Sequence, residues 1–88
     1  MDIHELNMLV KVVQAGSFTG AALAMNTQKA HVSRVVSGLE SKLGVRLLER
    51  STRSLSLTEV GRDLYERAVG ILGAVEEAER AAQATLAE

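Results

Sequence analysis

Cysteine, proline and tryptophan are absent from this 88-residue chain, and its aromatic residues are limited to Phe18 and Tyr65. The absence of cysteine excludes disulfide bonds and thiolate metal sites. The absence of proline removes the strongest helix breaker from the whole length. The core must therefore be built from Val, Leu, Ile, Ala and Met, and this composition favours a mainly helical fold.

Long apolar runs are missing as well. No segment approaches the roughly 18 apolar residues that a membrane-spanning helix needs, and the opening MDIHELN carries acids where a secretory signal has positive charge. We therefore expect a soluble, cytoplasmic chain with no membrane partner. The length corresponds to one small domain, which buries only about 60–65% of the surface that its unfolded form exposes.

The net charge of −1 conceals a segregation of charge along the chain. Residues 29–57 contain six basic and two acidic residues and carry +4, whereas residues 58–88 contain three basic and seven acidic residues and carry −4. Residues 1–28 carry −1. The basic segment is where a polyanionic partner is expected to bind.

Two helices are predicted in the first third of the chain. Apolar residues on one face of residues 3–15, followed by Gly16, indicate a helix that stops at that glycine. A second helix is expected at residues 18–25, capped by Ser17, and its small residues allow close approach by a neighbouring helix. The length of this second helix suits a packing element.

The third predicted helix covers about residues 28–43 and has two different faces. It follows Asn26, which tolerates the left-handed conformation of a tight turn, and it ends before Gly44. Two helices joined by such a short turn form a helix-turn-helix pattern. The buried stripe comprises Val32, Val36, Leu39 and Leu43. The polar face, which lacks a carboxylate before Glu40, carries Lys29, His31, Ser33, Arg34 and Ser37.

A β-hairpin is predicted at about residues 47–57. Leu55 and Leu57 alternate with serines, and Leu47 and Leu48 stand across a polar tip at residues 51–53. Period-two alternation beside a short polar loop is typical of two antiparallel strands.

The remaining residues predict one long helix, capped by Thr58 with Glu59 in its first turn. About 29 residues at 1.5 Å each give a length of about 43 Å, which exceeds the small domain before it. A core face, a membrane-surface face and a dimer seam are the alternatives for its apolar stripe. The acidic outer face disfavours anionic membranes, and the excess length favours a dimer seam. The stripe comprises Val60, Leu64, Ala68, Ile71, Leu72, Val75, Ala78, Ala82 and Leu86.

The segment GSFTGAALAMNTQKAHVSRVVSGLESKLGVRLLERSTRSLSLTEVG closely resembles the N-terminal region of LysR-type transcriptional regulators. The matching pieces are SFT with paired alanines, VSR followed by an apolar residue and LE, LGVRLLERS, and LTEVG. The resemblance covers essentially the whole chain. It implies a winged helix-turn-helix in residues 1–57 and a dimerising linker helix in residues 58–88. It also implies that the intact bacterial regulator has a further domain for a small-molecule effector, and it implies no cofactor.

The chain departs from the family pattern at the start of the third helix. Members often read SQPAVS there, whereas this chain reads QKAHVS at residues 28–33. A serine cap and a helix-opening proline are thus replaced. We expect the base-reading residues 29–31 to have a sequence preference of their own.

The predicted DNA contacts lie at the start of the third helix and at the hairpin tip. Recognition helices of this motif class enter the major groove with their first turns, and Arg34, opposite the buried stripe, can pair with guanine or with a phosphate. The alternative for each is an ordinary surface side chain, or a simple cap in the case of Ser17. The candidates are Arg34, Lys29, Ala30, His31, Ser33, Gln28, Arg53, Thr52, Arg50 and Ser17.

Catalysis is not expected, because the two histidines and the serines form no triad or metal-ligand spacing. We expect instead the DNA-binding domain of a transcriptional regulator, which binds inverted-repeat promoter DNA as a homodimer. A helical protein-interaction module that has lost DNA contact is the competing hypothesis. RNA binding is more distant, since only Phe18 and Tyr65 can stack on bases.

Overall fold

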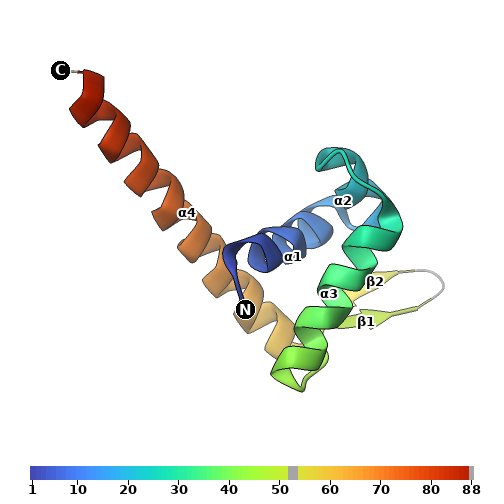
Figure 1. Ribbon diagram of the computed structural model, residues 1–88. Helices are drawn as coiled ribbons and strands as arrows, with labels where there is room; N and C mark the ends of the chain where they lie inside the picture. Colours follow the sequence, from blue (N-terminus) through green and yellow to red (C-terminus); the bar gives the residue numbers. More distant parts are fainter. Residues whose placement is uncertain (52–53, 88) are drawn as a thin grey trace.

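A computed structural model describes residues 1–51 and 54–87, which form a small head and one long projecting helix (Figure 1). The described part measures 53 × 25 × 19 Å. The predicted winged helix-turn-helix with a long final helix is confirmed. The elements are α1 (Ile3–Ala15), α2 (Phe18–Ala24), α3 (Lys29–Leu43), β1 (Leu48–Arg50), β2 (Leu55–Leu57) and α4 (Glu59–Ala87).

Helix α1 begins and ends where the sequence predicts. Glu5 N–H donates to Asp2 Oδ1 at 2.8 Å, and Asp2 N–H donates to Glu5 Oε1 at 2.9 Å, which forms a capping box. At the other end Gly16 has a φ of 74°, the left-handed conformation that favours glycine. The boundaries of α1 are therefore set by local chemistry.

The turn between α2 and α3 is also as predicted. Ser17 Oγ accepts a hydrogen bond from Gly20 N–H at 2.9 Å and caps α2, which ends one residue earlier than expected because Met25 is its C-cap. Asn26 takes a φ of 53°. Gln28 is the N-cap of α3, but its side chain makes no capping hydrogen bond, so the first backbone N–H groups of α3 have no side-chain cap.

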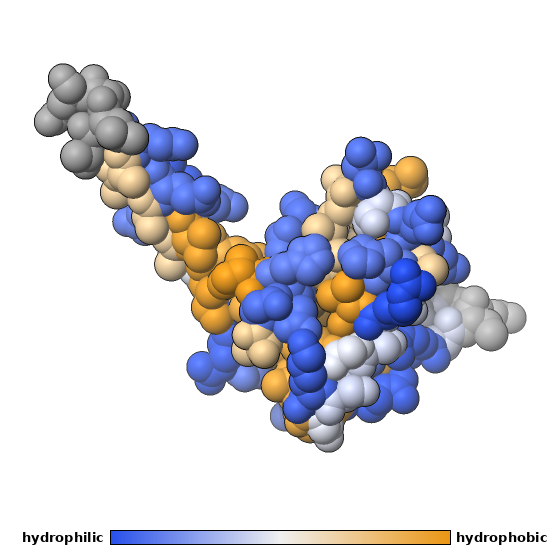
Figure 2. Space-filling view, viewed as in Figure 1, coloured by the Kyte–Doolittle hydropathy of each residue, from blue (hydrophilic) through white to orange (hydrophobic). Residues whose placement is uncertain are grey.

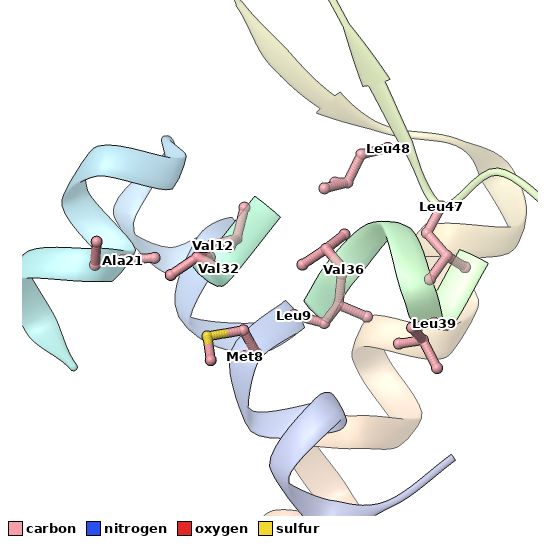
Figure 3. Packing of buried hydrophobic residues seen from close by; sticks show 10 residues of the cluster. Met8, Leu9, Val12, Ala21, Val32, Val36, Leu39, Leu47 and Leu48 are labelled. Atoms are coloured by element: carbon pink, nitrogen blue, oxygen red, sulfur yellow. The ribbon is translucent and has the colours of Figure 1, made fainter. Parts of the chain in front are cut away.

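The core lies where the three head helices meet the base of the hairpin (Figure 3). Three of the four residues predicted as the buried stripe of α3 belong to it. Leu43 does not, because α3 extends past the core at its last turn, where Leu43 is 40% exposed. The fully buried large side chains are Met8, Leu9, Val12, Val32, Val36, Leu39, Leu47 and Leu48.

The hairpin carries two strands of three residues in antiparallel register. Leu48 pairs with Leu57, and Arg50 pairs with Leu55. Below the tip, Ser51 N–H donates to the Ser54 carbonyl at 3.1 Å, and Ser54 N–H donates to Ser51 Oγ at 3.0 Å. The predicted hairpin is confirmed, while its tip at residues 52–53 lies outside the described residues.

Thr58 caps α4 and also ties this helix to the segment before β1. Its Oγ1 accepts a hydrogen bond from Gly61 N–H at 2.9 Å and donates to the Arg46 carbonyl at 2.7 Å. The backbone N–H of Thr58 donates to the Leu47 carbonyl at 3.0 Å. The predicted cap is therefore confirmed, and its hydroxyl has a second, tertiary role.

Replacing Thr58 by Val should lower the free energy of unfolding by about 1–2 kcal/mol, because the cap and the tie to Arg46 are both lost. Thr58→Ser keeps the hydroxyl and should stay within about 0.5 kcal/mol of the unaltered chain. Urea titration followed by far-ultraviolet circular dichroism measures both changes. Equal stability of the two variants would contradict this role of the hydroxyl.

The first half of α4 packs against α1. Leu6 and Val10 of α1 and Ala68 of α4 form a second buried cluster, with Leu64, Tyr65 and Leu72 partly buried beside it. Beyond this contact α4 leaves the head (Figure 1). Within the described part of the chain, the helices are too short or too polar to cross a lipid bilayer.

Candidate nucleic-acid interface

The start of α3 presents free positive charge to solvent. Gln28, Lys29, Ala30 and Arg34 are exposed, and neither Lys29 nor Arg34 forms an ion pair with any residue in the described ranges. An uncommitted cation on an exposed helix turn can pair with a phosphate or a base edge without first breaking an internal contact. These positions therefore keep the geometry that a DNA contact needs.

The other basic residues of the described part of the segment contact carboxylates of the same chain. Lys42 Nζ lies 2.6 Å from Glu5 Oε2, and this hydrogen bond to Lys42, together with the Asp2 N–H, lowers the pKa of Glu5. Arg46 and Arg50 both approach Glu40, at 3.7 and 3.1 Å. The sequence alone does not show that Lys42, Arg46 and Arg50 contact carboxylates whereas Lys29 and Arg34 do not.

His31 and Ser33 are less open than their neighbours, since both are half-buried. The His31 ring centroid lies 6.1 Å from that of His4 in α1. The His31 ring therefore sits on the α1 side of the first turns of α3. Base contact by His31 stays a prediction, and it requires the DNA to reach that side or the ring to turn.

Glu40 is a functional-site neighbour that the sequence reasoning missed. It is 7% exposed, and its Oε2 accepts hydrogen bonds from the N–H groups of Leu47 at 2.8 Å and Leu48 at 3.2 Å. Burial alone raises the pKa of Glu40, but the two backbone donors and Arg50 outweigh it and hold the pKa below its ordinary value. The available signal is its place four residues after the buried Val36, which puts a carboxylate on the core side of α3.

Arg50, a predicted DNA contact, is held against the surface of the head. Its Nη2 donates to Glu40 Oε1 at 3.1 Å, and its guanidinium carbon lies 5.3 Å from the centroid of the Phe18 ring. Its side chain is 32% exposed. Direct DNA contact by Arg50 remains untested, and it competes with these two internal partners.

A hollow of about 400 Å³ separates the start of α2 from the hairpin. It brings together three residues that were predicted from separate segments, namely Ser17, Lys29 and Arg50. Ser51 and Ser54 of the hairpin line the same space. A rim of hydroxyls and cations suits a sugar-phosphate backbone. The predicted contacts Thr52 and Arg53 lie outside the described residues.

The predicted dimer seam is divided between two environments. Leu64, Ala68 and Leu72 face α1 of the same chain, and Ala68 is fully covered there, which corrects the expectation that Ala68 is available to a partner. Figure 2 shows apolar surface where α4 leaves the head. The residues of the seam that stay exposed are Val60, Ile71, Val75, Ala78 and Ala82, and Val69 is exposed with them.

Over residues 1–51 and 54–87, no group of three or more His, Cys, Asp or Glu side chains is placed to hold a metal ion. The features that stand out on the described surface are instead Lys29 and Arg34 at the start of α3 and the hollow beside Lys29.

Comparison with known proteins places the chain among bacterial regulators. Residues 3–62 match the model of the bacterial regulatory helix-turn-helix protein, lysR family. The chain is 51% identical over 69 residues to the HTH-type transcriptional regulator CrgA of Neisseria meningitidis serogroup C (strain 8013), an alignment that covers 78% of this chain and 23% of CrgA. The chain thus spans about a quarter of the length of this curated relative.

Solved structures are similar over nearly the whole chain. The crystal structure of the BenM_DBD/catB site 1 DNA complex superposes with a TM-score of 0.96 at 31% identity, covering 100% of this chain and 99% of that chain. The crystal structure of CbnR, a LysR family transcriptional regulator, gives 0.88 at 32% identity, covering 96% of this chain but 29% of that chain. The long helix is therefore part of the shared architecture.

Proposed function

The chain belongs to the lysR family of bacterial regulatory helix-turn-helix proteins, and we propose that it is the sequence-specific DNA-binding domain of a transcriptional regulator, not an enzyme. The proposal is carried by Lys29 and Arg34 at the start of α3, which are exposed and form no ion pair with a described residue. The similarity to a BenM_DBD structure that contains DNA supports it.

The first turns of α3 enter the major groove, and the hairpin at about residues 47–57 lies against the backbone or the adjoining minor groove. Arg34 and Lys29 contact bases or phosphates, and Ala30 faces the bases beside them. Ser17 and Lys29, on the rim of the hollow between α2 and the hairpin, contact one stretch of sugar-phosphate backbone. Phosphate contacts supply most of the affinity, so binding falls steeply with salt. Contacts of residues 29–34 with the bases determine which DNA sequence is bound.

Two copies bind an inverted repeat as a homodimer. Residues 1–57 form the DNA-binding domain, and residues 58–88 form the linker helix, whose first half is shared with the head. The apolar side chains left exposed on α4, with a hollow of about 410 Å³ between α1 and α4, support pairing through this helix. In the intact cytoplasmic regulator, a further domain binds a small-molecule effector, which accords with the greater length of CrgA and CbnR.

Selection from a random duplex library at fixed salt tests this function. We expect enrichment of an inverted repeat whose half-sites are separated by about one or more helical turns, because a two-fold dimer presents two copies of α3. A protein-interaction module, which is the competing function, should enrich no sequence. It should also bind DNA equally well after Lys29 and Arg34 are replaced by alanine.

A further inference from the structure

One guanidinium connects three elements of the head. Arg50 is the last residue of β1, its charge partner Glu40 is in α3, and the ring beneath it belongs to Phe18, the first residue of α2. Glu40 in turn holds the N–H groups of Leu47 and Leu48 at the base of β1. These polar contacts therefore join the hairpin to α3 and α2, in addition to the apolar packing of Leu48 in the core.

The hairpin needs such an attachment. A ribbon of two three-residue strands is marginal by itself, and its tip begins directly after Arg50. Fixing the guanidinium against a charged and an aromatic partner therefore fixes the position of the last residue of β1 relative to α2 and α3. This position matters because Arg50 and Ser51 line the same hollow as Lys29.

We propose that Glu40, Arg50 and Phe18 form a positioning unit that sets the angle between the hairpin and the start of α3, so that Glu40 and Arg50 act on DNA binding without touching DNA. This inference rests on the proposed DNA-binding function. It assigns Arg50 a different role from the direct contact that the sequence suggests. It also explains why a segment that carries +4 keeps a buried carboxylate.

Removing the charge of Glu40 distinguishes the two possible roles of Arg50, direct DNA contact and positioning of the hairpin, because it should change the DNA affinity in opposite directions. A carboxylate near a polyanion opposes binding, so its removal should tighten DNA binding if only charge matters. If Glu40 holds the hairpin in place, the same removal should weaken binding to the preferred sequence. Glu40→Gln keeps the size of the side chain and removes the charge, which makes it the decisive variant.

The experiment compares two duplexes of equal length at one salt concentration: a duplex enriched by the unaltered chain from a random library, and the unselected library itself. We expect Glu40→Gln to weaken binding to the enriched duplex by about fivefold or more, with no loss on the unselected one. Arg50→Gln should lose a similar factor on the enriched duplex. The double variant should be no weaker than Arg50→Gln alone, because both changes release the same unit.

Glu49→Gln is the matched control. Glu49 precedes Arg50 in β1, is exposed, and has no ion pair with a described residue, so its variant makes the same charge change without loosening the hairpin. It should bind the enriched duplex as tightly as the unaltered chain or more tightly. Phe18→Leu, which removes the ring face but keeps an apolar side chain, should reduce the preference between the duplexes in the same direction as Arg50→Gln.

The ratio of the two affinities separates positioning from folding, since a smaller folded fraction lowers both affinities equally. Faster hydrogen exchange at the Leu47 and Leu48 amides in Glu40→Gln should accompany the loss of preference. The inference is overturned if Glu40→Gln binds the enriched duplex as tightly as Glu49→Gln does. If the unaltered chain itself does not distinguish the two duplexes, the proposed function fails and this inference fails with it.

Discussion

Gly61→Ala should be the most destabilising conservative change in the chain. A Cβ at this position would lie 2.0 Å from the Leu47 carbonyl oxygen and 2.8 Å from its carbon. These are backbone atoms, and the oxygen already accepts a hydrogen bond from the Thr58 N–H. The segment before β1 therefore cannot move aside without breaking this hydrogen bond to the start of α4. The free energy of unfolding should fall by about 3 kcal/mol, which corresponds to roughly 12–24 °C in Tm.

Gly70→Ala provides the matched control for this prediction. Gly70 lies in the same helix, and a Cβ there would meet nothing within 4 Å. Alanine is the better helix former, so this variant should be more stable than the unaltered chain by about 0.5–1 kcal/mol. Thermal unfolding of both variants measures the difference. If Gly61→Ala proved as stable as Gly70→Ala, the close approach of α4 to Leu47 would be refuted.

Arg34→Ala should produce the largest loss of DNA affinity among single surface changes. Arg34 is exposed and has no ion pair with a described residue, so its removal costs the head little stability, within about 0.5 kcal/mol. Binding to the enriched duplex should weaken by about 1–3 kcal/mol, which is roughly 5- to 150-fold in Kd. Fluorescence anisotropy at fixed salt measures this change.

Arg80→Ala controls for net charge in the same assay. Arg80 lies far along α4, where Nη1 is 3.9 Å from Glu76 Oε2, and its removal changes the net charge of the chain by the same amount. We expect its affinity to remain close to that of the unaltered chain. An equal loss in the two variants would show that Arg34 contributes only general charge and does not contact the site.

The element boundaries could be predicted because their determinants are local. Gly16 and Gly44 adopt the left-handed conformation that ends α1 and α3, Asn26 takes a positive φ in the turn between α2 and α3, and Thr58 caps α4. Each of these effects depends on one residue and its immediate neighbours along the chain. Apolar periodicity then identifies the buried face of α3 for the same reason.

The contacts that the charged side chains make with one another could not be predicted in the same way. Glu40 and Arg50 form an ion pair between α3 and β1, and the Phe18 ring of α2 lies against Arg50. Such contacts depend on how the elements pack, which a one-dimensional pattern does not encode. The apolar stripe of α4 has the same ambiguity, since periodicity does not reveal that α1 covers Ala68 and leaves Val75 exposed.

Because Ala68 is buried against Leu6 and Val10, α4 is anchored to the head at this point and projects from it as a rigid arm. In a dimer joined along α4, the distance between the two copies of α3 depends on the angle between α4 and the head at this contact. The part of α4 beyond Ala68 is about 28 Å long at 1.5 Å per residue, so a swing of about 10° displaces its far end by roughly 5 Å, which is more than one base-pair step of about 3.4 Å. A small change in the packing of Ala68 against α1 would thus be enough to change the half-site spacing that the dimer can bind.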